Sequence, residues 1–193
     1  MDEHLLEVKN LKVSFKIGKK KLTAVDNVTF SLDRGKVIGI VGESGCGKSV
    51  TATSIMRLVS PSVCEIDENS QILFEGEDLS KASEARMRKV RGNEISMIFQ
   101  ELCLVPDMSV AENIFIGREP KIGKTGIVDR KKLIRQTQEL LDSFEITFLR
   151  PTDSLRGMST AKMQMIEICK ALSYHSKLII MDEPTSSLTE DEC

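Results

Sequence analysis

The chain has 193 residues, which is enough for one domain with a substantial core and, at most, a smaller subdomain. Its 27 basic and 29 acidic residues give a net charge of −2, so bulk electrostatics provide no reason to expect binding to nucleic acid or anionic lipid. No apolar run approaches the roughly 18 residues of a membrane span, and five scattered cysteines without a CxxC pair indicate reduced thiols. We expect a cytosolic chain that is neither secreted nor membrane-spanning.

The first 35 residues predict two strands. One runs from Leu6 to Phe15, with its alternation interrupted at Asn10, and the other runs from Leu22 to Leu32. The basic stretch Ile17–Lys21 lies between them, and its Gly18 and lysines are typical of a solvated hairpin turn. The pattern therefore predicts an antiparallel hairpin.

The stretch GESGCGKS, Gly42–Ser49, matches the pattern of a phosphate-binding loop. The β-branched run Val37–Val41 predicts a strand before it, and apolar residues at helical spacing from Ala52 to Val59 predict a helix after it. Glycines allow the backbone N–H groups to wrap a phosphate, and the helix N-terminus adds partial positive charge. Lys48 would reach the β- and γ-phosphates, and the Ser49 hydroxyl would bind the bridging magnesium ion.

The middle of the chain predicts peripheral structure followed by a buried strand. A short strand is expected over Gln71–Phe74 and an exposed helix over Lys81–Arg91, which ends at Gly92. Ile95–Phe99 then reads as a buried strand that stops at Gln100.

Two capped helices are predicted between Gln100 and Gly157. Ser109 can cap a short helix and Asp129 a longer one. The loop Gly117–Gly126 between them contains Gly-Lys-Thr, but five residues instead of four separate this from the preceding glycine, so we reject a second phosphate loop. The inner side of the longer helix is expected to carry Leu133, Ile134, Leu140, Leu141 and Phe144.

The last part of the chain predicts a helix capped by Ser159 and a buried strand over Leu178–Met181. The helix has Met165, Ile168, Cys169 and Leu172 at helical spacing. Asp182 and Glu183 follow the strand, where one carboxylate can hold magnesium through its waters and the next can activate a water. In a mostly parallel sheet, Ser49 and Asp182 would both lie at the carboxyl ends of strands.

These motifs, in this order over nearly the whole length, resemble the ATP-binding cassette (ABC) ATPases. The resemblance implies an α/β fold: a P-loop NTPase core with a mostly parallel sheet, an N-terminal antiparallel β subdomain and a helical subdomain insert. It implies one incomplete nucleotide-binding domain over 1–193. Within it lie an antiparallel part (1–35), the core with the phosphate loop (36–100), the helical subdomain (101–158), and the signature helix with the Asp-Glu strand (159–193).

The same resemblance assigns roles to individual residues. Glu183 would be the general base, assisted by Lys48 and Gln100, and the ligands of Mg²⁺ would be Ser49, Gln100 and Asp182. Pro184–Thr189 resembles the loop that contacts the opposite subunit. The residues expected around ATP are Phe15 against the adenine, then Gly42, Glu43, Ser44, Gly45, Cys46, Gly47, Lys48, Ser49 and Val50, and, from a partner, Ser159 and Ala161.

The chain departs from the family pattern in its signature segment and at its end. The usual Leu-Ser-Gly-Gly-Gln appears as MSTAK, Met158–Lys162, where the methyl group of Ala161 can obstruct backbone approach to the γ-phosphate. The chain stops at Cys193, before the family's switch histidine, so the resemblance is to a truncated cassette. Residues up to Gln100 are similar to peptide-importer ATPases, whereas ELCLVPDMSVAENIFIGREP and MIEICKALSYHSKLIIMDEPTSSLTEDE are similar to sugar-importer ATPases.

Together these features predict the ATP-binding and hydrolysing subunit of an importer of sugars or peptides. By the resemblance it would work as a head-to-tail dimer of cassettes with transmembrane permease subunits, peripheral on the inner face of the cell membrane. One alternative is a cassette that binds nucleotide without hydrolysing it. Another is a soluble DNA-repair or translation ATPase, although the chain has none of the usual basic, zinc or coiled-coil insertions.

Overall fold

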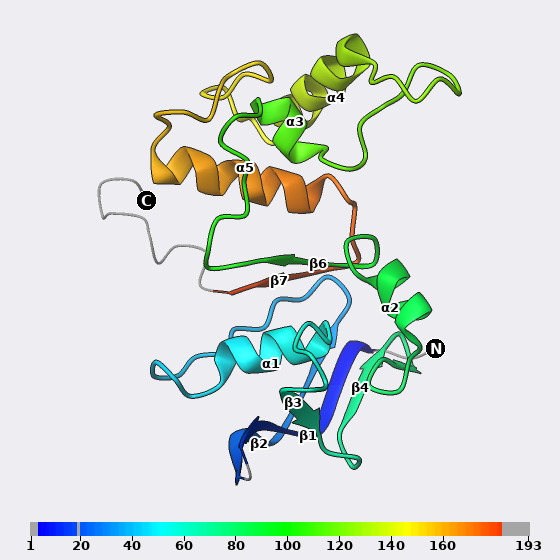
Figure 1. Cartoon of the computed structure of the whole chain (residues 1–193), viewed down its shortest axis with the longest axis vertical. Coiled ribbons are helices and arrows are strands. Elements are labelled where there is room, and N and C mark those ends of the chain that lie inside the picture. The colour runs from blue at the N-terminus through cyan, green and yellow to red at the C-terminus, as the bar shows by residue number, and fades with distance from the viewer. Residues whose placement is uncertain (1–3, 19, 183–193) are drawn as a thin grey trace. The chain divides into compact units, whose positions relative to one another are not determined.

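The computed structural model describes residues 4–18 and 20–182 (Figure 1). The chain divides into two compact units, Met1–Arg91 and Gly92–Cys193, and each is described by itself.

The first unit is built on an antiparallel sheet. Strands β1 (His4–Ile17) and β2 (Lys20–Asp33) form the predicted hairpin. The sheet order is β2-β1-β4-β5, with β3 also paired to β1; the added strands are β3 (Cys64–Ile66), β4 (Gln71–Phe74) and β5 (Glu77–Asp78). The interruption at Asn10 coincides with an irregularity, because Asn10 has φ of 51° and the register with β2 shifts between Val8 and Leu11.

Two short helices complete the first unit, α1 (Lys48–Ile55) and α2 (Glu84–Val90). Both are shorter than the sequence predicted, since Ser83 rather than an earlier residue caps α2 and Met56 ends α1. The side chain of Arg91, the residue after α2, links the ends of the two helices. It donates to the carbonyls of Met56 and Arg57, which follow α1, each at 2.8 Å.

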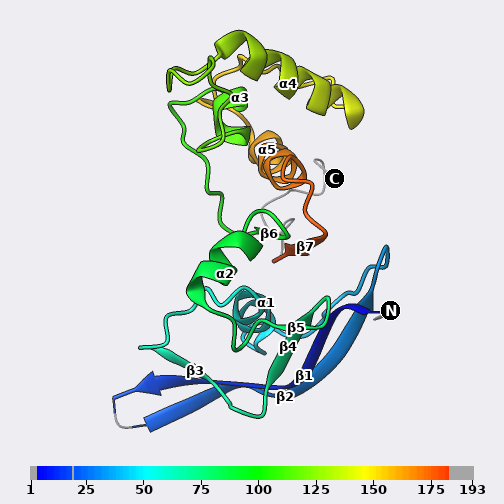
Figure 2. The same ribbon diagram turned by 90° about the vertical axis from the view of Figure 1, so that its right-hand side faces the viewer.

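The described residues of the second unit form a parallel strand pair and three helices. Strands β6 (Ile95–Ile98) and β7 (Leu178–Met181) pair in parallel, as predicted for buried strands of this type. The helices are α3 (Val110–Ile114), α4 (Arg130–Ser143) and α5 (Thr160–Leu172). Within this unit α5 lies between the β6–β7 pair and helices α3 and α4 (Figures 1 and 2).

Local chemistry accounts for the starts of these helices. Ser109 forms a capping box with Glu112 at α3, and Asp129 accepts the Lys132 N–H at α4. The hydrogen bonds from the backbone and hydroxyl of Ser109 hold the pKa of Glu112 below its usual value. All three helix caps predicted for this unit, Ser159 of α5 included, are confirmed.

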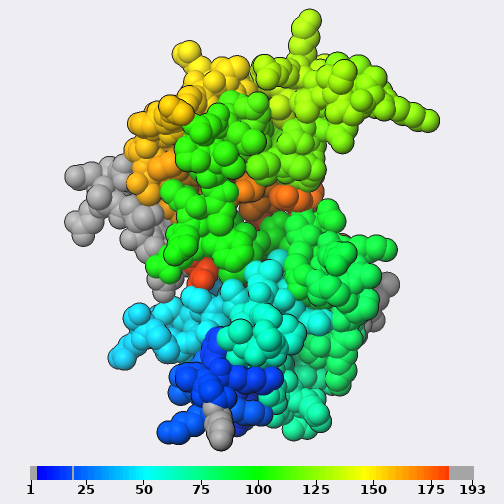
Figure 3. All heavy atoms as spheres, viewed as in Figure 1, coloured from blue at the N-terminus to red at the C-terminus, as the bar shows by residue number. Residues whose placement is uncertain are grey.

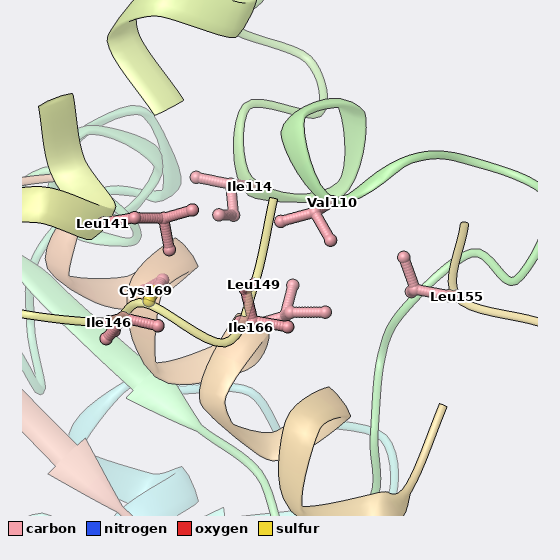
Figure 4. Packing of buried hydrophobic residues seen from close by; sticks show 8 residues of the cluster. All are labelled: Val110, Ile114, Leu141, Ile146, Leu149, Leu155, Ile166 and Cys169. Carbon is pink, nitrogen blue, oxygen red and sulfur yellow. The ribbon is translucent and has the colours of Figure 1, made fainter. Parts of the chain in front are cut away.

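The helices of the second unit share one apolar core (Figure 4). Ile114 of α3, Leu141 of α4 and Ile166 of α5 are fully buried and point toward one another. The complete buried cluster comprises Val110, Ile114, Leu141, Ile146, Leu149, Leu155, Ile166 and Cys169. Burial of this surface holds the helical segments together, since helices of this length are marginal alone.

We expect Ile166→Ala to destabilise the second unit by about 2–5 kcal/mol, because it leaves a cavity in this core, whereas Ile166→Val should cost only about 0.5–1.5 kcal/mol. Urea unfolding followed by circular dichroism measures both changes. Ile134→Ala on α4, where the residue is 41% exposed, is the matched control and should change stability by less than about 1 kcal/mol. Equal losses in Ile166→Ala and Ile134→Ala would contradict this packing.

One strand predicted from the sequence is wrong. Residues 36–43 form no strand in the described structure, and Val37 and Val41 are 98% and 96% exposed. A strand needs a hydrogen-bonded neighbour, but the strands of the first unit pair with one another and β6 pairs with β7. The β-branched residues of this stretch favour a strand, but no neighbouring strand pairs with it in the described structure.

Two predicted apolar faces are only partly right. On α4, Leu133 and Leu141 are buried, but Ile134 and Phe144 are 41% and 44% exposed. On α5 the buried side chains are Gln164, Ile166, Glu167, Cys169 and Ala171, so of the predicted set only Cys169 is fully buried. The reason is that α5 is covered from two sides, by α3 and by β6, so apolar spacing alone does not define its buried face.

Candidate functional site

The stretch Gly42–Ser49 forms a loop that ends in the first turn of α1. Gly47 is the residue before the helix, with φ of 95°, and a Cβ there would lie 2.6 Å from the carbonyl oxygen of Ala24. A Cβ on Gly42 would lie 2.6 Å from the Cys46 sulfur. Gly47 therefore requires glycine both for space beside the main chain and for its left-handed backbone, whereas at Gly42 the exposed Cys46 side chain could turn away.

Lys48 is folded back across this loop. Its ammonium group donates to the carbonyl oxygens of Gly42 at 2.8 Å and Glu43 at 3.0 Å. The turn behind it is fixed because Thr51 donates to the Gly47 carbonyl through both its backbone N–H, at 2.8 Å, and its hydroxyl, at 2.9 Å. A lysine ammonium held in this loop at the start of a helix suits an anionic ligand.

The helix that follows the loop supports the same interpretation. Helix α1 starts without a side-chain cap hydrogen bond and without an acidic residue in its first turn, so its positive end is not neutralised by its own sequence. The loop residues Glu43, Ser44, Gly45 and Cys46 are exposed, as is Ser49, while Val50 is half-buried. The residues present thus fit a bound phosphate.

Phe15 lies in the same unit as the loop. It is half-buried near the end of β1, where it pairs with Leu22 of β2 and Cys64 of β3. Helix α1 packs against β1 and β2, so the loop and Phe15 belong to one compact body. Its expected contact with adenine remains a prediction.

Gln100 and Asp182 lie in the second unit, at the carboxyl ends of two adjacent parallel strands. Gln100 follows β6 and is exposed, while Asp182 follows β7 and is half-buried. The strand ends are joined because the Asp182 N–H donates to the Ile98 carbonyl at 3.0 Å. The structure therefore brings these two predicted magnesium ligands to one edge of the β6–β7 pair. The expectation that Ser49 also lies at the carboxyl end of a strand is wrong, because residues 36–43 ahead of the loop form no strand.

The remaining predicted site residues are divided between the described and undescribed parts of the chain. Ser159 is exposed and caps α5, accepting the Lys162 N–H at 3.4 Å, and Ala161 is half-buried in the first turn. Glu183 and the segment Pro184–Thr189 lie outside the described residues.

Three polar residues near the site were missed by the sequence interpretation. Asn113 of α3 is 1% exposed and bonds both backbone groups of Val105, at 2.7 and 3.1 Å. Glu167 and Lys170 of α5 bond the backbone of Cys103. The partner of Asn113 is eight residues away, but no motif marked it. The partner of Glu167 and Lys170 lies 64 and 67 residues away, so no signal in the sequence indicated it.

The described residues contain no group of three or more His, Cys, Asp or Glu side chains arranged to hold a metal ion. A magnesium ion in the site expected here needs few protein ligands, because phosphate oxygens and waters supply the others. The thiols do not form such a group either. Cys64 and Cys169 are buried, and burial raises the pKa of Cys169 to about 11, so that thiol stays protonated at neutral pH.

The Gly-Lys-Thr stretch that was rejected as a second phosphate loop lies in an exposed loop of the second unit. Every residue from Lys121 to Ile127 is exposed, in the part of the surface coloured yellow-green in Figure 3. An isolated bridge joins Lys121 to Val128. Neither a strand before it nor a helix N-terminus directly after it supports a phosphate site, so the rejection of a second phosphate loop is consistent with the structure. In the part of the chain that the structure describes, no helix is long and apolar enough to cross a membrane.

The fold is that of ABC transporter cassettes. A solved dimeric bacterial ABC transporter cassette superimposes with a TM-score of 0.76 over 97% of this chain and 77% of its own, at 22% identity. The same cassette in a post-hydrolysis state bound to ADP and Pi gives the same values. Residues 25–186 match the family model of ABC transporters, and with this match over most of its length the chain belongs to the ABC transporter family.

Sequence relatives carry names from sugar import. The chain is 44% identical over its whole length to a putative ribose/galactose/methyl galactoside import ATP-binding protein of Halalkalibacterium halodurans, of which it covers 34%. It is 36% identical, over 98% of its length, to the ribose import ATP-binding protein RbsA 1 of Streptomyces avermitilis, of which it covers 33%. The chain thus spans about a third of the length of these relatives.

Proposed function

We propose that the chain is the ATP-binding and hydrolysing part of an importer ATPase. The observation that carries the proposal is the loop Gly42–Ser49, in which Lys48 is held over main-chain carbonyls at the start of α1. Membership of the ABC transporter family adds the expected nucleotide, ATP. Nucleotide binding is the part of this function that the geometry supports most directly.

The proposed division of labour follows the positions of the residues. Lys48 would bind the β- and γ-phosphates, and Phe15 would lie against the adenine. When bound, Mg²⁺ would neutralise phosphate charge, and the residues that the family resemblance offers to hold it are Ser49, Gln100 and Asp182. Glu183 would accept the proton of the attacking water.

Ser159 supports a role for a second cassette. It lies exposed at the N-terminus of α5, whose 13 residues give it a dipole that favours an anion at this end. We propose that this end faces the nucleotide of a partner cassette in a head-to-tail dimer. Transmembrane permease subunits would then hold the dimer at the inner face of the cell membrane.

The cargo is proposed to be a sugar. Both relatives reported above are named for ribose or galactose import, and the match to each covers nearly the whole chain, including the N-terminal part that is similar to peptide importers. We propose the segment 101–158 as the helical subdomain that contacts the permease, and its first part, residues 101–120, is similar to sugar importers. The likeness of residues up to Gln100 to peptide importers remains a prediction about sequence alone.

A second candidate function is nucleotide binding without turnover, and Ala161 favours it. This residue replaces the usual glycine in the first turn of α5, where its methyl group adds bulk beside Ser159. The two functions predict different results in one pair of measurements on the full chain, a calorimetric titration with ATP·Mg²⁺ and an assay of phosphate release. Binding with steady release supports the ATPase, binding without release supports the second candidate, and no binding rejects both.

A further inference from the structure

The segment that follows β6 is a short arch whose two ends are fixed. It starts at Ile98, which pairs with β7 and accepts the Asp182 N–H. It ends at Val105, whose two backbone groups bond the side chain of Asn113. Gln100 is exposed near the start of this arch.

Between these ends, both backbone groups of Cys103 are held by α5. Its N–H donates to a carboxylate oxygen of Glu167 at 3.0 Å, and its carbonyl accepts from the Lys170 ammonium at 3.3 Å. Glu167 and Lys170 lie 3.7 Å apart as an ion pair, with side chains only 11% and 19% exposed. Two side chains of α5 thus hold both the N–H and the carbonyl of Cys103, and we call this arrangement the clamp.

This clamp is an unusual use of charge. Removing a carboxylate and an ammonium from water is expensive, and such pairs often contribute little to stability compared with apolar residues of similar size. The neighbouring positions Ile166 and Cys169 do pack apolar side chains into the core. The most direct effect of this charged pair is therefore to fix the position of the arch.

We infer that Glu167 and Lys170 are positioning residues that fasten the Gln100 arch to α5, so that a shift of Gln100 is passed to Ser159 at the start of the same helix. This inference rests on the proposed function, in which Gln100 faces bound Mg²⁺ and nucleotide. Cys103 is the third residue after Gln100, which is a chain span of at most about 11 Å. Helix α5 is the rigid element that connects the clamp to Ser159.

Hydrogen–deuterium exchange on the full chain tests the clamp. Peptides covering 99–104 and 158–163 are followed with and without a non-hydrolysable ATP analogue and Mg²⁺. In the unsubstituted chain we expect the analogue to slow exchange in both peptides. In Glu167→Ala we expect exchange of 99–104 to be about tenfold faster without nucleotide, because the Cys103 N–H loses its partner, and the nucleotide effect on 158–163 to disappear.

Three further variants make the result specific. Glu167→Gln keeps an oxygen acceptor for the Cys103 N–H and should retain most of the effect on 158–163. Lys170→Met removes the bond to the Cys103 carbonyl and should weaken the effect, which provides a second test where Glu167→Ala does not fold. Glu139→Ala, an exposed glutamate of α4, should behave as the unsubstituted chain does.

The outcomes separate the inference from the proposed function. If the unsubstituted chain responds in both peptides and Glu167→Ala responds equally, the clamp does not connect them and the inference is overturned. If the unsubstituted chain shows no response to the analogue at all, the proposed nucleotide function itself is overturned together with the inference. Loss of the effect on 158–163 alone, with analogue affinity within about twofold, supports the inference.

Discussion

Lys48→Ala is expected to weaken ATP binding by at least about 100-fold. A hydrogen bond to a charged group contributes roughly 1.5–3 kcal/mol, and the Lys48 ammonium would exchange its contacts with Gly42 and Glu43 for more than one phosphate oxygen. Alanine also leaves the phosphate charge in the loop without its nearest cation. Isothermal titration calorimetry with ATP·Mg²⁺ measures the change.

Lys36→Ala is the matched control for this prediction. Lys36 is an exposed lysine of the same unit, ahead of the loop, and its removal changes net charge by the same amount. It should alter the affinity by less than about threefold, because Lys36 lies outside the phosphate-loop motif and salt screens an exposed charge. A Lys48→Ala chain that binds ATP as tightly as the unsubstituted chain would falsify the phosphate-loop assignment.

Glu183→Gln is expected to lower the rate of ATP hydrolysis by about 10²–10⁴-fold while leaving ATP affinity within about threefold, provided that the unsubstituted chain hydrolyses ATP. Glutamine has nearly the same shape as glutamate but cannot take a proton from the attacking water. Glu183 directly follows Asp182, which the structure places at the end of β7. Steady-state phosphate release and a parallel binding titration measure the two quantities.

The control for this second prediction is Glu139→Gln, the same change at an exposed site on α4. It should leave both hydrolysis and binding as they are. If Glu183→Gln instead hydrolyses at the unsubstituted rate, the general base must be another residue. If it loses binding as well, the substitution has acted on the nucleotide site as a whole rather than on proton transfer.

Predictions that depended on neighbouring residues were the most successful. The caps at Ser109, Asp129 and Ser159 are all confirmed, because a side-chain oxygen and an N–H three residues later meet wherever a helix starts. The hairpin around Gly18 is confirmed for a similar reason, since a glycine with φ of 60° suits a turn that few other residues can make.

Predictions that depended on distant partners were less successful. The run Val37–Val41 has strand composition, but no strand forms there in the described chain. Ile134 and Phe144 were expected to be buried on α4 yet are substantially exposed, because the neighbouring elements cover only part of that helix. Composition gives a preference, and packing decides whether it is realised.

The phosphate loop shows how much the sequence determined by itself. Gly47 and Lys48 were identifiable from spacing because each has a requirement that operates within a few residues, a left-handed backbone at Gly47 and the reach of Lys48 back to Gly42. The positions of Gln100 and Asp182 after buried strands were equally accessible, since strand ends are visible as the end of an apolar run.

Only the tertiary structure showed that the Gln100 arch is clamped to α5. Cys103 and Glu167 are 64 residues apart, and neither residue belongs to a motif that predicts the other. The interaction requires α5 to pack beside the end of β6, which the apolar core of the second unit brings about. Local hydrogen bonds and dihedral preferences are encoded over a few residues, whereas the pairing of a buried carboxylate with one backbone N–H exists only after the chain has folded.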